Sequence, residues 1–173
     1  ADDTRHACHD AIPPAPLIAF TRSVSQSNNA AIRTADLQRT RLAARLESER
    51  NRRRLADVDA LAQVPSVRRS VTTFRRLDAQ RNALMTLQAH MICDGTLEPR
   101  YRDGLFTWRT GHALDLYQRR NFLVPNARFD DETRAALLAG SRELSFRGAL
   151  RALRERTADA AALIEDGTAG TGP

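Results

Sequence analysis

The residues of this sequence best suited to chemistry are two cysteines and the histidines beside them. Cys93 follows His90 by about one helical turn, and a thiol next to an imidazole base is the arrangement of a nucleophilic cysteine. Met91 and Ile92 lie between them, however, and apolar surroundings favour a buried or disulfide-bonded cysteine. We therefore predict no catalysis at Cys93.

Metal-ligand residue types gather near the N-terminus, at His6, Cys8, His9 and Asp10. Such a set could contribute to a zinc site. No second ligand cluster completes a tetrahedral site, so a disordered terminus is the favoured interpretation. We predict neither a metal nor another cofactor.

Three consecutive carboxylates, Asp130, Asp131 and Glu132, suggest acid–base chemistry. They stand at the start of a predicted helix, where the helix dipole stabilises negative charge. Capping therefore explains them, and we predict that this chain is not an enzyme.

Cys8 and Cys93 are too few for a disulfide scaffold, but an even number fits one bridge formed in an oxidising compartment. Two unrelated thiols are the alternative, and spacing alone does not decide between them. A bridge would tie the N-terminal segment to the middle of the chain.

Trp108, the only tryptophan, is accompanied by aromatic and charged neighbours. Sugar rings stack on exposed aromatic rings, and guanidinium groups bind carboxylates. Packing in the core is the alternative role for a lone tryptophan. The candidate ligand-binding residues are Tyr101, Arg102, Asp103, Trp108 and Arg109.

The composition describes a chain of 173 residues, 42% hydrophobic but only 5% aromatic, with a net charge of +6. This length suits one domain with an extension, and a core of Leu, Ala and Val favours helices. Basic excess indicates a polyanion partner, but every basic residue is Arg, which weakens that inference.

No apolar run is long enough to span a membrane. The first residue is Ala1, as in a mature exported protein or a trimmed one.

The order of patterns along the chain predicts an all-α fold. Prolines and a Ser/Asn-rich stretch mark the first segment, and apolar residues at helical spacing mark the later ones. Ser66 is placed to cap the second long helix, and Asp94-Gly95 to end it. The predicted segments are an extended arm (1–29), a helical hairpin extension (30–83), a small helical domain (84–140), a C-terminal helix (141–166, regular from about Ser145) and a tail or linker (167–173).

An internal repeat is the most informative feature. The spacing Phe106-xxx-Thr110-xx-Ala113-Leu114 recurs as Phe129-xxx-Thr133-xx-Ala136-Leu137. Thr107 and Asp130 stand where helix N-caps are expected, and a threonine follows three residues later in each copy. We predict two helices that start alike and share one apolar centre, with Tyr117 in that core and its hydroxyl at the surface.

Three further motifs surround the repeat: Leu87-Gln88, Asp103-Gly104-Leu105-Phe106 and Tyr117-Gln118. In this order, the segment from Leu84 to Leu138 resembles the bacterial peptidoglycan-binding family, whose fold is a small three-helix bundle. The family usually has glycine where this chain has Thr107 and Asn121. The resemblance implies a long helical hairpin followed by a small peptidoglycan-binding-like bundle and a C-terminal helix.

The function implied by the resemblance is that of a non-catalytic module that binds or scaffolds the peptidoglycan cell wall, in a periplasmic or otherwise exported bacterial protein. Its expected partners are peptidoglycan and other domains of the same parent protein. The flanking helices, together with the closing run of Leu150, Leu153 and Ile164-Glu165-Asp166-Gly167, also resemble N-terminal regions of large exported L,D-transpeptidase-like cell-wall enzymes, whose active site would lie outside this chain. The alternative is an Arg-rich helical protein that binds nucleic acid.

Overall fold

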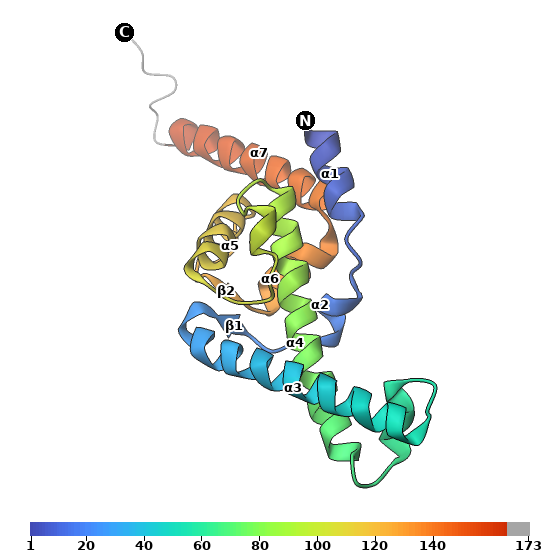
Figure 1. Ribbon diagram of the computed structural model, residues 1–173. Coiled ribbons are helices and arrows are strands. Elements are labelled where there is room, and N and C mark those ends of the chain that lie inside the picture. Colours follow the sequence, from blue (N-terminus) through green and yellow to red (C-terminus); the bar gives the residue numbers. More distant parts are fainter. Residues whose placement is uncertain (166–173) are drawn as a thin grey trace.

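The computed structural model describes residues 1–165, which are almost entirely helical (Figure 1). The prediction of an all-α fold is confirmed. Only two very short strands interrupt the helices of the described part. In chain order the elements are α1 (Asp2–Asp10), α2 (Ala15–Ala19), β1 (Val24–Ser25), the 3-10 helix η1 (Gln26–Asn28), α3 (Asn29–Arg53), η2 (Val58–Gln63), α4 (Arg68–Cys93), η3 (Pro99–Tyr101), α5 (Trp108–Arg120), β2 (Arg128–Phe129), α6 (Asp131–Ala139) and α7 (Ser141–Glu165).

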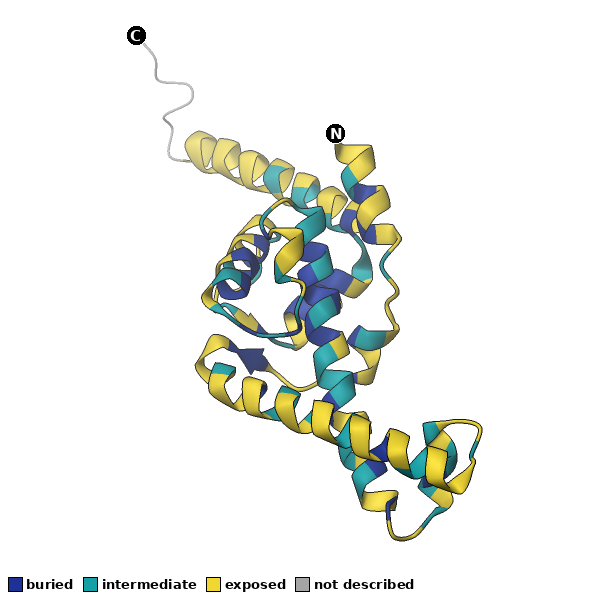
Figure 2. Ribbon diagram, in the orientation of Figure 1, coloured by how far each residue is buried: buried dark blue, intermediate teal, exposed yellow. Residues whose placement is uncertain are grey.

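Helix α4 runs through the middle of the molecule and carries most of its core (Figures 1 and 2). Ala83, Leu84, Leu87 and Met91 recur at helical spacing and are fully buried. Around them pack apolar side chains from α2, α3, α5, β2, α6 and the turns between them, including Leu17, Ile32, Phe106, Leu114, Tyr117, Phe129 and Leu137. Phe106 and Phe129 thus share one apolar centre, as the repeat predicts.

A second, smaller cluster lies at the far end of the hairpin formed by α3 and α4. Helix α3 ends where Arg54 adopts a left-handed conformation (φ 56), and η2 then folds back. Leu46, Leu61, Val67 and Val71 bury one another there. The predicted Ser66 cap is wrong: Val67 occupies the N-cap position, and no side chain caps α4.

The prediction of an extended arm over residues 1–29 is wrong, because this segment forms α1, α2, β1 and η1. The prolines begin a helix rather than prevent one: Pro16 stands in the first turn of α2, where its missing N–H costs nothing. Leu17, Phe20 and Val24 are buried in the main core. β1 pairs antiparallel with β2, and Val24 lies opposite Phe129.

A disulfide bond joins Cys8 of α1 to Cys93 at the end of α4, so the bridged alternative is confirmed. The interpretation of the N-terminus as disordered is wrong, because α1 is fixed by this bridge and by buried His6 and His9. The cysteines are 85 positions apart. Closing a loop of this size restricts the unfolded chain and stabilises the fold by about 4.6 kcal/mol in the chain-entropy model.

Helix α7 begins at Ser141, a turn earlier than the sequence pattern indicated. Its first turns pack against α1 and α6, and from Leu153 to Glu165 every residue is exposed (Figure 2). The predicted tail at 167–173 lies outside the described residues. Among the described helices, none combines the length and apolarity that crossing a membrane requires.

Candidate functional site

Two buried glutamines brace the turns that begin α5 and α6. In the first, the Gln88 side-chain amide donates hydrogen bonds to the Leu105 carbonyl (2.9 Å), the Asp103 carboxylate (3.1 Å) and the Thr110 hydroxyl (3.1 Å). Its oxygen accepts from the backbone N–H of Gly104 (2.8 Å). Every polar atom of the buried Gln88 amide group is therefore used, so the turn is rigidly positioned against α4.

Gln118 on α5 repeats this arrangement for the second turn. Its amide donates to the Arg128 carbonyl, the Asn126 side chain and the Thr133 hydroxyl, each at 3.0 Å. Its oxygen accepts from the backbone N–H of Ala127 (2.9 Å). The structural repeat is thus longer than the sequence repeat, because it includes the glutamine. The side chains of the paired threonines accept hydrogen bonds from these glutamines.

The first braced turn leads into a shallow surface hollow of about 180 Å³. Trp108 opens α5 and is 58% exposed. The Arg109 guanidinium lies over the Tyr101 ring (4.4 Å to its centroid) and over the Trp108 ring (4.5 Å). These three side chains form a preorganised aromatic and cationic surface, which we call the Trp108 platform.

The structure separates the five residues proposed from the sequence. Tyr101, Trp108 and Arg109 come together at the hollow. Arg102 faces a different recess, beside the disulfide bond. Asp103 is engaged within the turn, where its carboxylate accepts from Gln88 and from the backbone N–H of Leu105 (2.9 Å).

Sequence reasoning missed three polar residues that line the same hollow: Thr96, Glu98 and His112. His112 lies one turn after Trp108 on α5, a spacing that places both on one helix face, so this residue was recognisable. Thr96 and Glu98 stand in the loop after α4, and no local pattern marks them.

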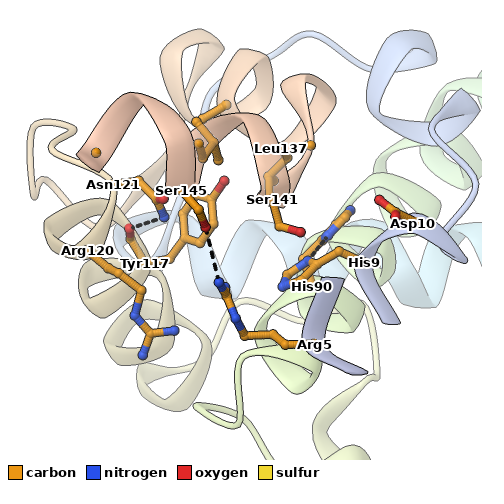
Figure 3. A pocket seen from close by; sticks show the side chains of 14 residues that line it. Arg5, His9, Asp10, His90, Tyr117, Arg120, Asn121, Leu137, Ser141 and Ser145 are labelled. Atoms are coloured by element: carbon orange, nitrogen blue, oxygen red, sulfur yellow. Dashed lines mark hydrogen bonds between the residues drawn. The ribbon is translucent and has the colours of Figure 1, made fainter. Parts of the chain in front are cut away.

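A second pocket, of about 280 Å³, lies between α1, α5, α6 and the start of α7 (Figure 3). We call it the α7 pocket. Arg5 of α1 and Arg120 of α5 line it, and both guanidinium groups contact the buried Asp94 carboxylate, at 3.2 Å and 3.6 Å. His9 Nε2 donates to the same carboxylate oxygen at 2.8 Å. Burial acts to raise the pKa of Asp94, but hydrogen bonds from His9 and Arg5 and the charges of His9 and Arg120 outweigh it, so the pKa is lowered.

Two stacked histidine rings, His9 and His90, lie at one side of the pocket (Figure 3). Their Nδ1 atoms are 2.7 Å apart, so one ring donates a hydrogen bond to the other. Burial, reinforced by the charge of His9, lowers the pKa of His90 to about 4. His90 is therefore neutral near pH 7, and it serves to orient His9 against Asp94.

The Tyr117 hydroxyl differs from the sequence prediction, which placed it at the surface. It is buried, and among the described residues it has no hydrogen-bond partner. Burial and the nearby Asp94 charge raise the pKa of Tyr117, so this hydroxyl stays protonated and able to donate. The α7 pocket had no sequence signal, because its walls come from segments as distant as Arg5 and Gly148.

Comparisons of the chain with family models, curated proteins and solved structures found no match.

Proposed function

We propose that this chain is a non-catalytic module that binds or scaffolds peptidoglycan, as part of an exported, periplasmic protein. The observation that carries the proposal is the Trp108 platform at the edge of a hollow. An exposed indole offers a flat face to a sugar ring, and the Arg109 guanidinium offers a charge to a stem-peptide carboxylate. The disulfide bond supports an oxidising compartment.

Rigidity of the platform supports the same proposal. Trp108 and Arg109 follow directly from the turn that Gln88 holds, and the hydrogen bonds of that turn fix where α5 begins. Little ordering of the protein is then needed when a ligand arrives, and preorganisation of this kind improves affinity.

Nucleic-acid binding is the less favoured alternative. On the arginine-rich hairpin, Arg50 pairs with Glu47, and both Arg52 and Arg53 pair with Glu49. Arg75 likewise pairs with Asp59. These partners cancel part of the positive charge that a phosphate backbone requires.

A pull-down on purified peptidoglycan sacculi at moderate salt tests the proposal. We expect retention of the wild type and about tenfold weaker binding of Trp108→Ala and Arg109→Ala. The matched control is Phe146→Ala, since Phe146 is an exposed aromatic residue (62%) on α7, outside the hollow. Absence of wild-type retention removes the binding claim and leaves a structural spacer.

Salt dependence separates the two classes of partner. Binding through stacking and a few charges persists at moderate salt, whereas nucleic-acid binding falls steeply as salt rises. Retention on sacculi that disappears with modest salt, together with tight binding of duplex DNA at low salt, contradicts the peptidoglycan proposal.

A further inference from the structure

The α7 pocket holds hydrogen-bonding capacity that the protein itself does not use. Tyr117 lines the pocket and is only 4% exposed, and its buried hydroxyl has no hydrogen-bond partner among the described residues. Buried polar groups in folded proteins are nearly always paired. A protonated phenol hydroxyl in this position can donate to an oxygen atom that enters the pocket.

The charges lining the pocket favour an anion. Arg5 and Arg120 share the single buried carboxylate of Asp94, and they approach the same oxygen of it. Asp10 also lines the pocket, but it is exposed, so water screens its charge. The guanidinium of Arg120 sits 3.6 Å from Asp94, which leaves most of its five donors available.

One part of the remaining wall is small or apolar, whereas Asn121, Ser141 and Ser145 contribute polar groups. Ala136 and Leu137 of α6 face Leu144 of α7, and Gly140 and Gly148 leave space between the helices. A pocket of about 280 Å³ is at the small end for ligand sites. The small volume and the apolar part of the wall suit an acid with a short aliphatic group, and a nucleotide is too large for the pocket.

We propose that the α7 pocket binds a small monocarboxylate, whose carboxylate accepts a hydrogen bond from Tyr117 and is attracted by the positive charges of Arg5 and Arg120, and whose short aliphatic chain contacts Leu137 and Leu144. Two sources share this chemistry: a free short-chain acid, and the C-terminal carboxylate of a peptide ending in a small residue. This inference goes beyond the proposed wall binding. It rests on different residues, so either proposal can fail alone.

Titration of the ¹⁵N-labelled full chain, followed by amide NMR shifts, provides the test. We expect saturable shifts with propionate, concentrated at the end of α5 and the first turns of α7, and none with propionamide. Glycyl-alanine distinguishes the sources: binding at the same amides more tightly than propionate assigns a peptide terminus, and weaker binding assigns a free acid. No saturable shift with propionate, equal response to the amide, or tighter binding of inorganic phosphate overturns the proposal.

Variants locate the bound carboxylate. Tyr117→Phe removes only the unpartnered hydroxyl, and we expect about tenfold weaker propionate binding with the fold retained. Arg120→Gln should weaken it to a similar extent. The control is Arg119→Gln on the same helix, because Arg119 pairs with Asp115 and does not line the pocket. Wild-type affinity in Arg120→Gln overturns the assignment even if Tyr117→Phe does not fold.

Discussion

The turns braced by Gln88 and Gln118 have the same hydrogen-bond pattern but different residues at equivalent positions. The first turn reads Asp103-Gly104-Leu105-Phe106, and the second reads Asn126-Ala127-Arg128-Phe129. In each, a side-chain oxygen at the first position accepts from the backbone N–H two residues on, at 2.9 Å. The second position has positive φ in both, +75 at Gly104 and 52 at Ala127.

What lies behind each turn explains the difference in sequence. A Cβ atom on Gly104 would come within 2.8 Å of the Arg81 Cγ atom and 3.3 Å of the Arg81 carbonyl oxygen, because this turn packs directly on α4. Ala127 is only half-buried, so the second turn has room for the Cβ atom that the first turn excludes. The hydrogen bonds define the turn, whereas the surroundings decide whether glycine is obligatory.

The largest expected effect comes from removing either glutamine. Gln88→Leu and Gln118→Leu each delete four hydrogen bonds and leave buried donors and acceptors unpaired. We expect each to lower the free energy of unfolding by about 4 kcal/mol. Urea denaturation measures the loss, with the exposed Gln38→Leu on α3 as the control. If one glutamine variant is as stable as that control, the two turns are not energetically equivalent.

Exchanging the residue types at the second turn position should give effects of opposite sign. Gly104→Ala meets both the steric contact with Arg81 and the left-handed backbone, and we expect a loss of about 2 kcal/mol. Ala127→Gly relieves a positive φ, and we expect a change between zero and a gain of about 1 kcal/mol. Thermal unfolding of both variants measures the two changes, and equal losses contradict the role assigned to α4.

Of the two braced turns and the helices that follow them, the sequence reveals the residues that recur at fixed spacing. Phe106, Thr110 and their equivalents have identical offsets, so two similar helix starts and a shared core were predictable. The glutamine brace was not, because Gln88 and Gln118 precede their turns by different loop lengths. Its recognition requires the folded positions of α4 and α5.

The N-terminal segment was mispredicted because its structure depends on distant residues. Short helices such as α1 are marginal in isolation, and here a disulfide bond and buried His9 contacts stabilise α1. For the same reason the α7 pocket could not be predicted, since Arg5, Asp94 and Arg120 meet only after folding. The Trp108 platform was accessible to prediction because its residues are close in sequence.

The smallest expected effect concerns the N-caps of the two helices. The Asp130 carboxylate accepts from the backbone N–H of Thr133 at 3.0 Å, whereas the Thr107 side chain makes no such bond. We expect Asp130→Ala to lower the free energy of unfolding by about 1 kcal/mol at pH 7, and Thr107→Ala to change it by less than about 0.5 kcal/mol.

Acid should abolish the Asp130 effect. Burial acts to raise the pKa of Asp130, but hydrogen bonds from Asn126 and Thr133 prevail and lower it. A carboxylate with a lowered pKa in the folded state contributes stability that is complete above its ordinary pKa of about 3.9 and is lost as pH falls through the folded value. Urea unfolding of wild type and Asp130→Ala at pH 7, 4 and 3 should therefore converge toward acid. A stability difference that stays constant across this range contradicts the role of the Asp130 charge. The lost stability then comes from packing, and the Asp130 carboxylate stabilises the start of α6 no more than the Thr107 side chain stabilises the start of α5.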